Sequence, residues 1–112
     1  MRIHTDKNGV YVNAISTLAN GDSVEGHLYQ VITGAKVTDL SFQQGGVKDH
    51  GVNGLTSEAL LEVLIHRTRY LDAQFPCNEN RRAIVAMAQA LHAFESRTAS
   101  RTERGVEGRE VA

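Results

Sequence analysis

Residues 56–94 read TSEALLEVLIHRTRYLDAQFPCNENRRAIVAMAQALHAF, and this segment is the most informative about the fold. Its apolar residues recur every three or four positions on both sides of Phe75-Pro76, which is the spacing of amphipathic helices. Because the residue before a proline disfavours helical torsions, the first helix is predicted to end near Gln74. The stretch therefore predicts two helices joined by a short turn, a helical hairpin.

Polar residues mark the start of each predicted helix. Thr56 or Ser57 suits the N-cap of the first helix, and Asn78 or Asn80 that of the second, because their side chains accept a bond from an early helical N–H. The second helix is predicted to run to about Arg104, which precedes a glycine. A two-helix hairpin cannot bury two apolar stripes alone, so self-association through the helices is expected.

The first part of the chain has a different period. Residues 9–15, GVYVNAI, alternate apolar with small or polar residues, as a β-strand does. Asn8-Gly9 and Asn20-Gly21 favour tight hairpin turns, in which both central positions take positive φ. Further apolar runs follow in residues 23–33 and 37–43, so three or four short antiparallel strands are expected.

Glycine dominates the segment between the two parts, residues 45–54, GGVKDHGVNG. Four glycines in ten residues and no apolar period predict a loop. Such a loop can bring backbone N–H groups close to a ligand, or it can be a simple connector. We therefore predict a single α+β domain, divided into a β-sheet part (1–44), a Gly-rich junction (45–55), a helical hairpin (56–104) and a tail (105–112).

Length and composition exclude several classes of protein. A chain of 112 residues, 41% hydrophobic, has room for one domain with a modest core. No apolar run approaches the ~20 residues of a membrane helix, and the polar first residues lack a signal-peptide core, so a cytoplasmic protein is expected. The net charge of −1 argues against binding to polymeric nucleic acid, which usually requires a clear positive excess.

All basic residues after Leu55 are arginines, and three of them share one helical face. Arg97, Arg101 and Arg104 are spaced i, i+4 and i+7. Guanidinium groups bind phosphate oxygens in pairs, so this face is a candidate phosphate site. An exposed ion-pair network with nearby glutamates, such as Glu103, explains the spacing equally well.

Two further side chains are candidates for ligand binding. The ring of Tyr70, near the end of the first helix, could stack on a purine, although core packing is the favoured interpretation. Asn80 could hydrogen-bond a ligand, although helix capping is favoured. Cys77 is expected to be a small apolar residue at a helix start rather than a nucleophile.

Catalytic patterns are absent from the sequence. There is no phosphate-binding loop motif, no nucleophile elbow and no helix with paired histidine ligands, and the five histidines lack metal-ligand spacing. A non-catalytic binding protein, without metal or cofactor, is therefore predicted.

Several motifs resemble the Thoeris anti-defence family of phage proteins. They cover roughly residues 41–108 and are FQQGGVK at 42–48, GVNGLT at 51–56, LIHR at 64–67, FPCNEN at 75–80, SRTASR at 96–101 and RGVEG at 104–108. The helical-hairpin motif also occurs in phage anti-CBASS proteins.

The resemblance implies that the protein is a sponge. Such proteins bind cyclic ADP-ribose isomers made by bacterial TIR-domain enzymes and hold them intact in the host cytosol, so that the defence effector is never activated. Some members also hold cyclic di- or trinucleotides at a separate site. The family assembles from dimers, in some members into hexamers, with ligand pockets between subunits.

The resemblance also implies roles for individual residues. Tyr70 should stack on the ligand, Asn80 should supply a polar contact, and Arg97 and Arg101 should bind phosphate. With Arg104 of the same face and the ribose-side contacts of the junction, the predicted ligand-binding set is Tyr70, Asn80, Arg97, Arg101, Arg104, Gln44 and Gly46. This chain departs from the family at Tyr70, where Phe is more common, and at Asn78, where Arg is expected, and both departures bear on ligand preference.

Two other functions are weighed against the sponge. A phage protein that binds a host protein through the apolar face of the hairpin would bind no nucleotide, and changes in the apolar stripe would abolish its function. A hydrolase of the same signals would release product from the bound ligand, and the lack of an acid–base or metal constellation disfavours it.

Overall fold

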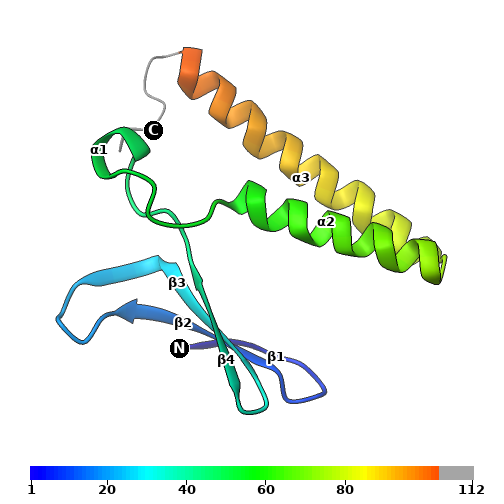
Figure 1. Cartoon of the computed structure of the whole chain (residues 1–112), viewed down its shortest axis with the longest axis horizontal. Coiled ribbons are helices and arrows are strands. Elements are labelled where there is room, and N and C mark those ends of the chain that lie inside the picture. Colours follow the sequence, from blue (N-terminus) through cyan, green and yellow to red (C-terminus); the bar gives the residue numbers. More distant parts are fainter. Residues whose placement is uncertain (104–112) are drawn as a thin grey trace. The chain divides into compact units, whose positions relative to one another are not determined.

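The computed structural model describes residues 1–103, and its contacts divide the chain into two compact units, Met1–Leu55 and the residues from Thr56 onward. The first unit is a four-stranded sheet followed by a short helix, and the second is a helical hairpin (Figure 1). The predicted α+β fold is therefore confirmed, with four strands.

The sheet is an antiparallel meander in which each strand pairs with the next along the chain. Tyr29 stands at its centre, opposite Ala14 on one side and Leu40 on the other. The strand order follows the sequence, and the strands are β1 (Arg2–Thr5), β2 (Tyr11–Thr17), β3 (Ser23–Thr33) and β4 (Lys36–Ser41).

The first two turns of the sheet lie where the Asn-Gly pairs predicted them. In the first turn, Asp6 Oδ1 accepts hydrogen bonds from the backbone N of Asn8 at 2.8 Å and of Val10 at 3.1 Å. Only the glycine of each pair takes positive φ, 82° at Gly9 and 92° at Gly21. The expectation of positive φ at both central positions is wrong, because side-chain acceptors fix these turns with the asparagines in ordinary conformations.

The Gly-rich junction contains one turn of helix, α1 (Val47–His50), where a plain loop was predicted. The Gly46 carbonyl accepts bonds from the backbone N of Asp49 at 3.1 Å and of His50 at 2.8 Å, which closes this turn. The hydrogen bonds are local, so they need no apolar period to form, and the sequence pattern therefore did not reveal them.

Backbone pairing holds the end of the junction to the end of β4. The Gln43 N–H donates to the Leu55 carbonyl at 2.8 Å, and the Leu55 N–H donates to the Ser41 carbonyl at 2.9 Å. A Cβ added to Gly54 would lie 2.6 Å from Gln43 N and 2.6 Å from the carbonyl oxygen of Phe42. Glycine is required here because the two backbone segments are in direct contact.

The helices of the second unit are α2 (Ser57–Gln74) and α3 (Asn78–Glu103). Thr56 caps α2, since its Oγ1 accepts from Ala59 N at 3.1 Å. The expected asparagine cap of α3 is wrong. Cys77 precedes the helix, and its Sγ accepts from Asn80 N at 3.4 Å, in the position that a capping oxygen normally occupies.

Very little of the described chain is buried. Ile65 of α2, at 3% exposure, is the one buried apolar residue among residues 1–103. Large apolar side chains of the hairpin remain exposed, including Val63, Val85 and Phe94. Among residues 1–103, no helix is long and apolar enough to cross a membrane.

Candidate functional site

The predicted ligand-binding residues fall in both units. Gln44 and Gly46 lie in the sheet unit, and Tyr70, Asn80, Arg97 and Arg101 lie on the helical hairpin. Arg104 lies outside the described residues.

Tyr70 lies in the second-last turn of α2 and is 60% exposed. The favoured expectation that it packs in the core is wrong, because most of its side-chain surface is exposed. An exposed tyrosine ring is available for stacking on another planar group.

Asn80 is half-buried in the first turn of α3. Because Cys77 occupies the capping position, the Asn80 side chain is not needed to cap the helix. The side chain forms no hydrogen bond with any described residue, so its amide is available to a ligand.

The two described arginines of the predicted phosphate face differ in environment. Arg97 is exposed and forms no ion pair with any described residue, so the structure lends no support to a network between Arg97 and Glu103. Arg101 is 8% exposed and is engaged by a neighbour. Arg97 is therefore the more accessible cation of this face.

The structure does not bring Tyr70 and Asn80 together with Arg97 on one chain. Asn80 and Arg97 stand 17 positions apart on α3, a separation of about 25 Å at about 1.5 Å of rise per residue. Tyr70 shares the end of the hairpin with Asn80, since both flank the turn between the helices. A single small ligand cannot contact both ends of the hairpin of one chain.

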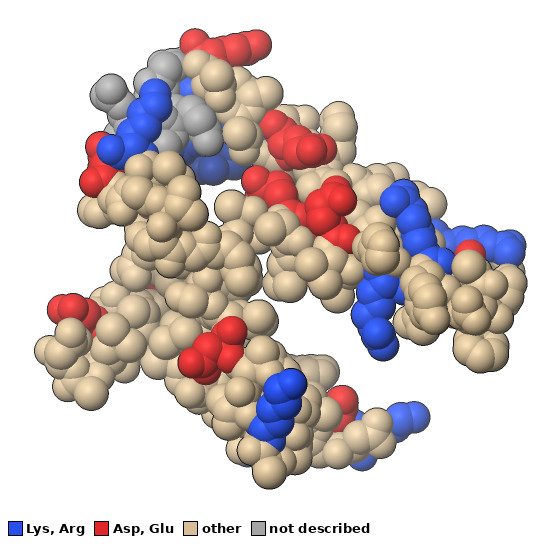
Figure 2. All heavy atoms as spheres, in the orientation of Figure 1, with Lys and Arg blue, Asp and Glu red and all other residues tan. Residues whose placement is uncertain are grey.

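A second group of arginines surrounds the turn end of the hairpin. The last two turns of α2 and the first turn of α3 contain Arg67, Arg69, Arg81 and Arg82, and Figure 2 shows basic side chains toward this end of the hairpin. Among residues 1–103, Arg81 is the member with an ion pair, 3.7 Å from Nε to Asp72 Oδ2. Sequence reasoning passed over this group, although its members flank the FPCNEN motif on both sides.

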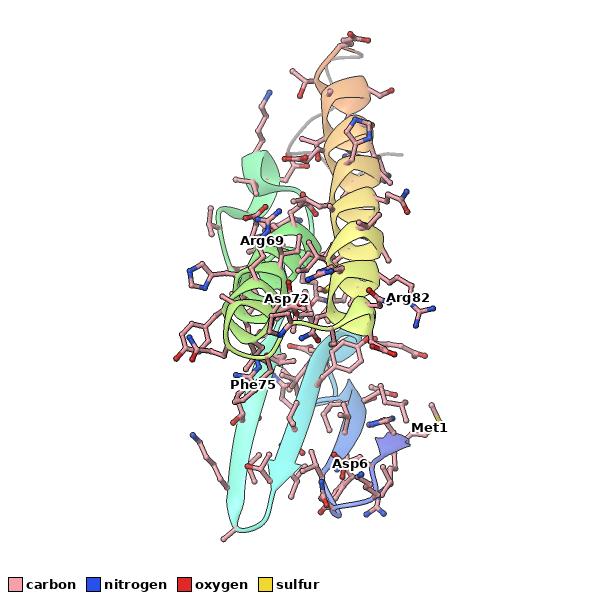
Figure 3. All side chains as sticks on the ribbon, turned by 90° about the vertical axis from the view of Figure 1, so that its right-hand side faces the viewer. Met1, Asp6, Arg69, Asp72, Phe75 and Arg82 are labelled. Atoms are coloured by element: carbon pink, nitrogen blue, oxygen red, sulfur yellow. The ribbon has the colours of Figure 1, made fainter. Side chains whose placement is uncertain are left out.

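Asp72 organises the turn itself. Its Oδ1 accepts from Cys77 N at 3.1 Å while its Oδ2 faces Arg81, so one carboxylate joins the end of α2 to the start of α3. Figure 3 shows Asp72 at this turn and Arg82 projecting outward from α3. The outward direction leaves Arg82 accessible, and it has no ion pair with a described residue.

Two adjoining cavities of about 460 and 310 Å³ lie on the surface of the hairpin. They share Val85 and Gln89. Arg69 and His92 line the larger cavity, and Arg82 lines the smaller one. This face thus combines an apolar floor with cations at its edges.

In the sheet unit, Gln44 holds the junction through three hydrogen bonds. Its backbone N–H donates to Asn53 Oδ1 at 2.8 Å, and its carbonyl accepts from Asn53 Nδ2 at 2.8 Å. Its side-chain Nε2 donates to the Ser23 carbonyl at 3.1 Å. Gly46 closes the turn of α1 through its carbonyl. In the structure, both residues have structural roles.

Gln43, which the sequence analysis did not select, is the centre of the junction. Its Nε2 donates to the carbonyls of Gly45 at 3.1 Å and Gly51 at 2.8 Å, and its Oε1 accepts from Asn53 N at 2.9 Å. The glycine-rich backbone is thus bound internally. Within residues 1–103, no three His, Cys, Asp or Glu side chains gather to hold a metal ion.

No protein-family model matches the chain. A curated protein named Thoeris anti-defense 1, from Bacillus phage SBSphiJ7, is 42% identical over 74 residues, which are 65% of this chain and 52% of the relative. The predicted resemblance to the Thoeris anti-defence family is confirmed. The chain spans about half the length of this Thoeris anti-defence relative.

Proposed function

We propose that the protein is a phage anti-defence sponge, which binds cyclic ADP-ribose-type signals in the host cytosol and sequesters them without degradation. The observation that carries the proposal is that an exposed Tyr70 and an Asn80 side-chain amide without a bond to a described residue belong to the same end of the hairpin. The similarity to Thoeris anti-defense 1 supports an anti-defence role. Cyclic di- or trinucleotides are a second ligand class for the same protein.

The proposed site needs two copies of the chain. Asn80 lies about 25 Å along α3 from Arg97, and Tyr70 belongs to the same end of the hairpin as Asn80, so one chain supplies only half of the contacts. An antiparallel pair of hairpins places the Tyr70 end of one copy beside the Arg97 end of the other. The exposed Val85 and Phe94 favour such pairing, because association removes their apolar surface from water.

Sequestration requires affinity rather than turnover. To compete with an effector that responds to nanomolar signal, the sponge needs a binding free energy of about −12 kcal/mol. Stacking on Tyr70 supplies about 1–3 kcal/mol per base. Charge-assisted hydrogen bonds from arginines to the phosphates are the stronger contribution to affinity. Each site formed holds one signal molecule.

Calorimetry with glycocyclic ADP-ribose, followed by heat release and chromatography of the ligand, tests this proposal. Tight binding with the ligand recovered intact supports a sponge, whereas recovery of a cleaved product supports a hydrolase. Arg97→Ala should cause the larger loss of binding, through the lost phosphate contact. Tyr70→Ala should weaken binding about 5- to 150-fold, the equivalent of about 1–3 kcal/mol of stacking.

Mixing the two variants tests the two-copy site. Each mixed dimer has one site with both residues intact, so an equal mixture should recover about a quarter of the wild-type sites. Arg82→Ala is the matched control, an exposed arginine at the other end of the hairpin. If Arg82→Ala abolishes binding while Arg97→Ala does not, the phosphate contacts come from the turn end of a single chain.

The apolar cavities favour one alternative function, binding of a host protein through the hairpin. Val85 is 57% exposed and lines both cavities. In this case Val85→Lys should abolish protection of phage against Thoeris in infected cells, and Arg97→Ala should not. A sponge predicts the loss of protection with Arg97→Ala.

A further inference from the structure

The sheet unit contains a cavity of its own, separate from the residues proposed to bind the signal on the helices. Its volume is about 290 Å³, and it lies beside β3 and the end of β4 (the strands are labelled in Figure 1). One wall is apolar and consists of Leu18, Val24, Leu28 and Phe42.

Hydrogen bonds fix the opposite wall. Gln44 and Asn53 both line the cavity, and they are joined by two hydrogen bonds of 2.8 Å. Gln44 Nε2 also donates to the Ser23 carbonyl on β3, which ties the junction to the sheet. The ring of Phe42 is held edge-on by Tyr29, with 5.8 Å between ring centroids. The cavity is therefore preformed, which lowers the entropy lost on binding.

Two lining side chains have unused hydrogen-bonding groups. Neither the His27 imidazole nor the Ser41 hydroxyl bonds to a described residue, although the backbone of each is paired. Each of these groups can act as donor and acceptor. Groups of this kind can bond to a ligand that carries both donors and acceptors.

The lining carries no Lys, Arg, Asp or Glu. The residues that flank Ser23 and Val24 in the chain are Asp22 and Glu25, both acidic. Phosphate would find no cation here and would be repelled by neighbouring carboxylates. The lining therefore disfavours an anionic ligand.

We propose that the cavity binds an uncharged heteroaromatic ring of the nucleobase class, free or as a nucleoside. The apolar wall covers the ring, and His27 and Ser41 bond to its polar edge. A volume of about 290 Å³ suits one ring system, because pockets for larger ligands extend to about 1,000 Å³. The cavity is complete on one chain and makes no use of the arginines.

NMR titration of the full chain with adenosine, guanosine, cytidine and uridine tests the proposal. At least one nucleoside should shift the backbone amide signals of His27, Ser41 and Phe42. Its 5′-monophosphate should bind no more tightly than the nucleoside itself, because no cation lines the cavity. Absence of shifts with all four nucleosides, or tighter binding of the monophosphate through this cavity, would overturn it.

Two variants and a control locate the binding. Leu18→Trp, which fills the cavity from its rim, should abolish the shifts, and His27→Ala should weaken binding about tenfold, or about 1.4 kcal/mol, the upper range for one hydrogen bond. Val37→Trp, at an exposed apolar position outside the lining, should change neither. Unchanged nucleoside binding in both cavity variants refutes the assignment.

Nucleoside binding to the cavity can be distinguished from binding of the cyclic signal by the proposed sponge site. Arg97→Ala is expected to abolish binding of the cyclic signal and to leave nucleoside binding intact. If nucleoside binding is lost in Arg97→Ala, the nucleoside occupies the helical site and the cavity proposal is wrong. If only the cyclic signal fails to bind the wild-type protein, the sponge proposal fails and the cavity stands.

Discussion

Replacing Gly54 with alanine should open the contact between the junction and the end of β4. An added Cβ would lie 2.6 Å from Gln43 N and would overlap the Phe42 carbonyl group. These are backbone atoms, which cannot rotate away. The backbone must separate, and the bonds between Gln43 and Leu55 and between Leu55 and Ser41 are then weakened.

The expected cost is a large share of the stability of a small protein. Overpacking costs about 1–3 kcal/mol, and each of the two hydrogen bonds contributes about 0.5–1.5 kcal/mol. A loss of about 2–6 kcal/mol is therefore expected, against a total of about 5–15 kcal/mol for a typical domain.

Urea unfolding measures the global effect, and amide hydrogen exchange at Gln43 and Leu55 measures the local one. Both amides should exchange faster in Gly54→Ala. Val52→Ala is the control, an 80% exposed position in the same loop where a change below about 0.5 kcal/mol is expected. Wild-type stability and unchanged protection of both amides in Gly54→Ala would refute the reasoning.

Three further predictions concern the hairpin. Ile65→Ala should lower the free energy of unfolding by about 2–5 kcal/mol, because it truncates a buried apolar side chain of the hairpin. Leu64→Ala changes a neighbour that is 42% exposed and should lower it by less than half as much. Thermal melts followed by circular dichroism measure both effects. Thr56→Ala should cost about 1 kcal/mol through the lost cap and Thr56→Ser little, in the same melts. Asp72→Asn removes the ion pair to Arg81, which is 62% exposed, and should cost at most about 1 kcal/mol. Asp72→Ala should cost more, because the Cys77 backbone N–H also loses its acceptor. Equal urea midpoints for the two variants would contradict this order.

The helices could be predicted from the sequence because their ends depend on local chemistry. Pro76 ends α2 near Gln74, and Thr56 starts it, as the pattern indicates. The cap of α3 could not be predicted, because a thiol is a weak acceptor and Asn78 and Asn80 are the better capping residues by type. The geometry of the turn places Cys77 at the cap all the same.

The candidate site was predicted less well than the fold. Side-chain type suggested buried packing for Tyr70, but the exposure of a helical position depends on the direction in which the partner helix lies. Gln44 and Gly46 were selected by resemblance, while their hydrogen-bond partners, Asn53 and His50, lie elsewhere in the junction. The periodicity of a sequence does not indicate hydrogen bonds of this kind, so only the structure identifies them.

Because Tyr70 and Arg97 belong to opposite ends of the hairpin, the number of proposed binding sites depends on protein concentration. If each binding site is shared by two copies, the number of sites follows mass action. Below the dimer dissociation constant, it rises with the square of the protein concentration, so early protein synthesis yields few sites and later synthesis yields many. A cell that also makes an excess of a variant lacking both Tyr70 and Arg97 would lose its sites by subunit exchange, because every mixed pair then has no intact site.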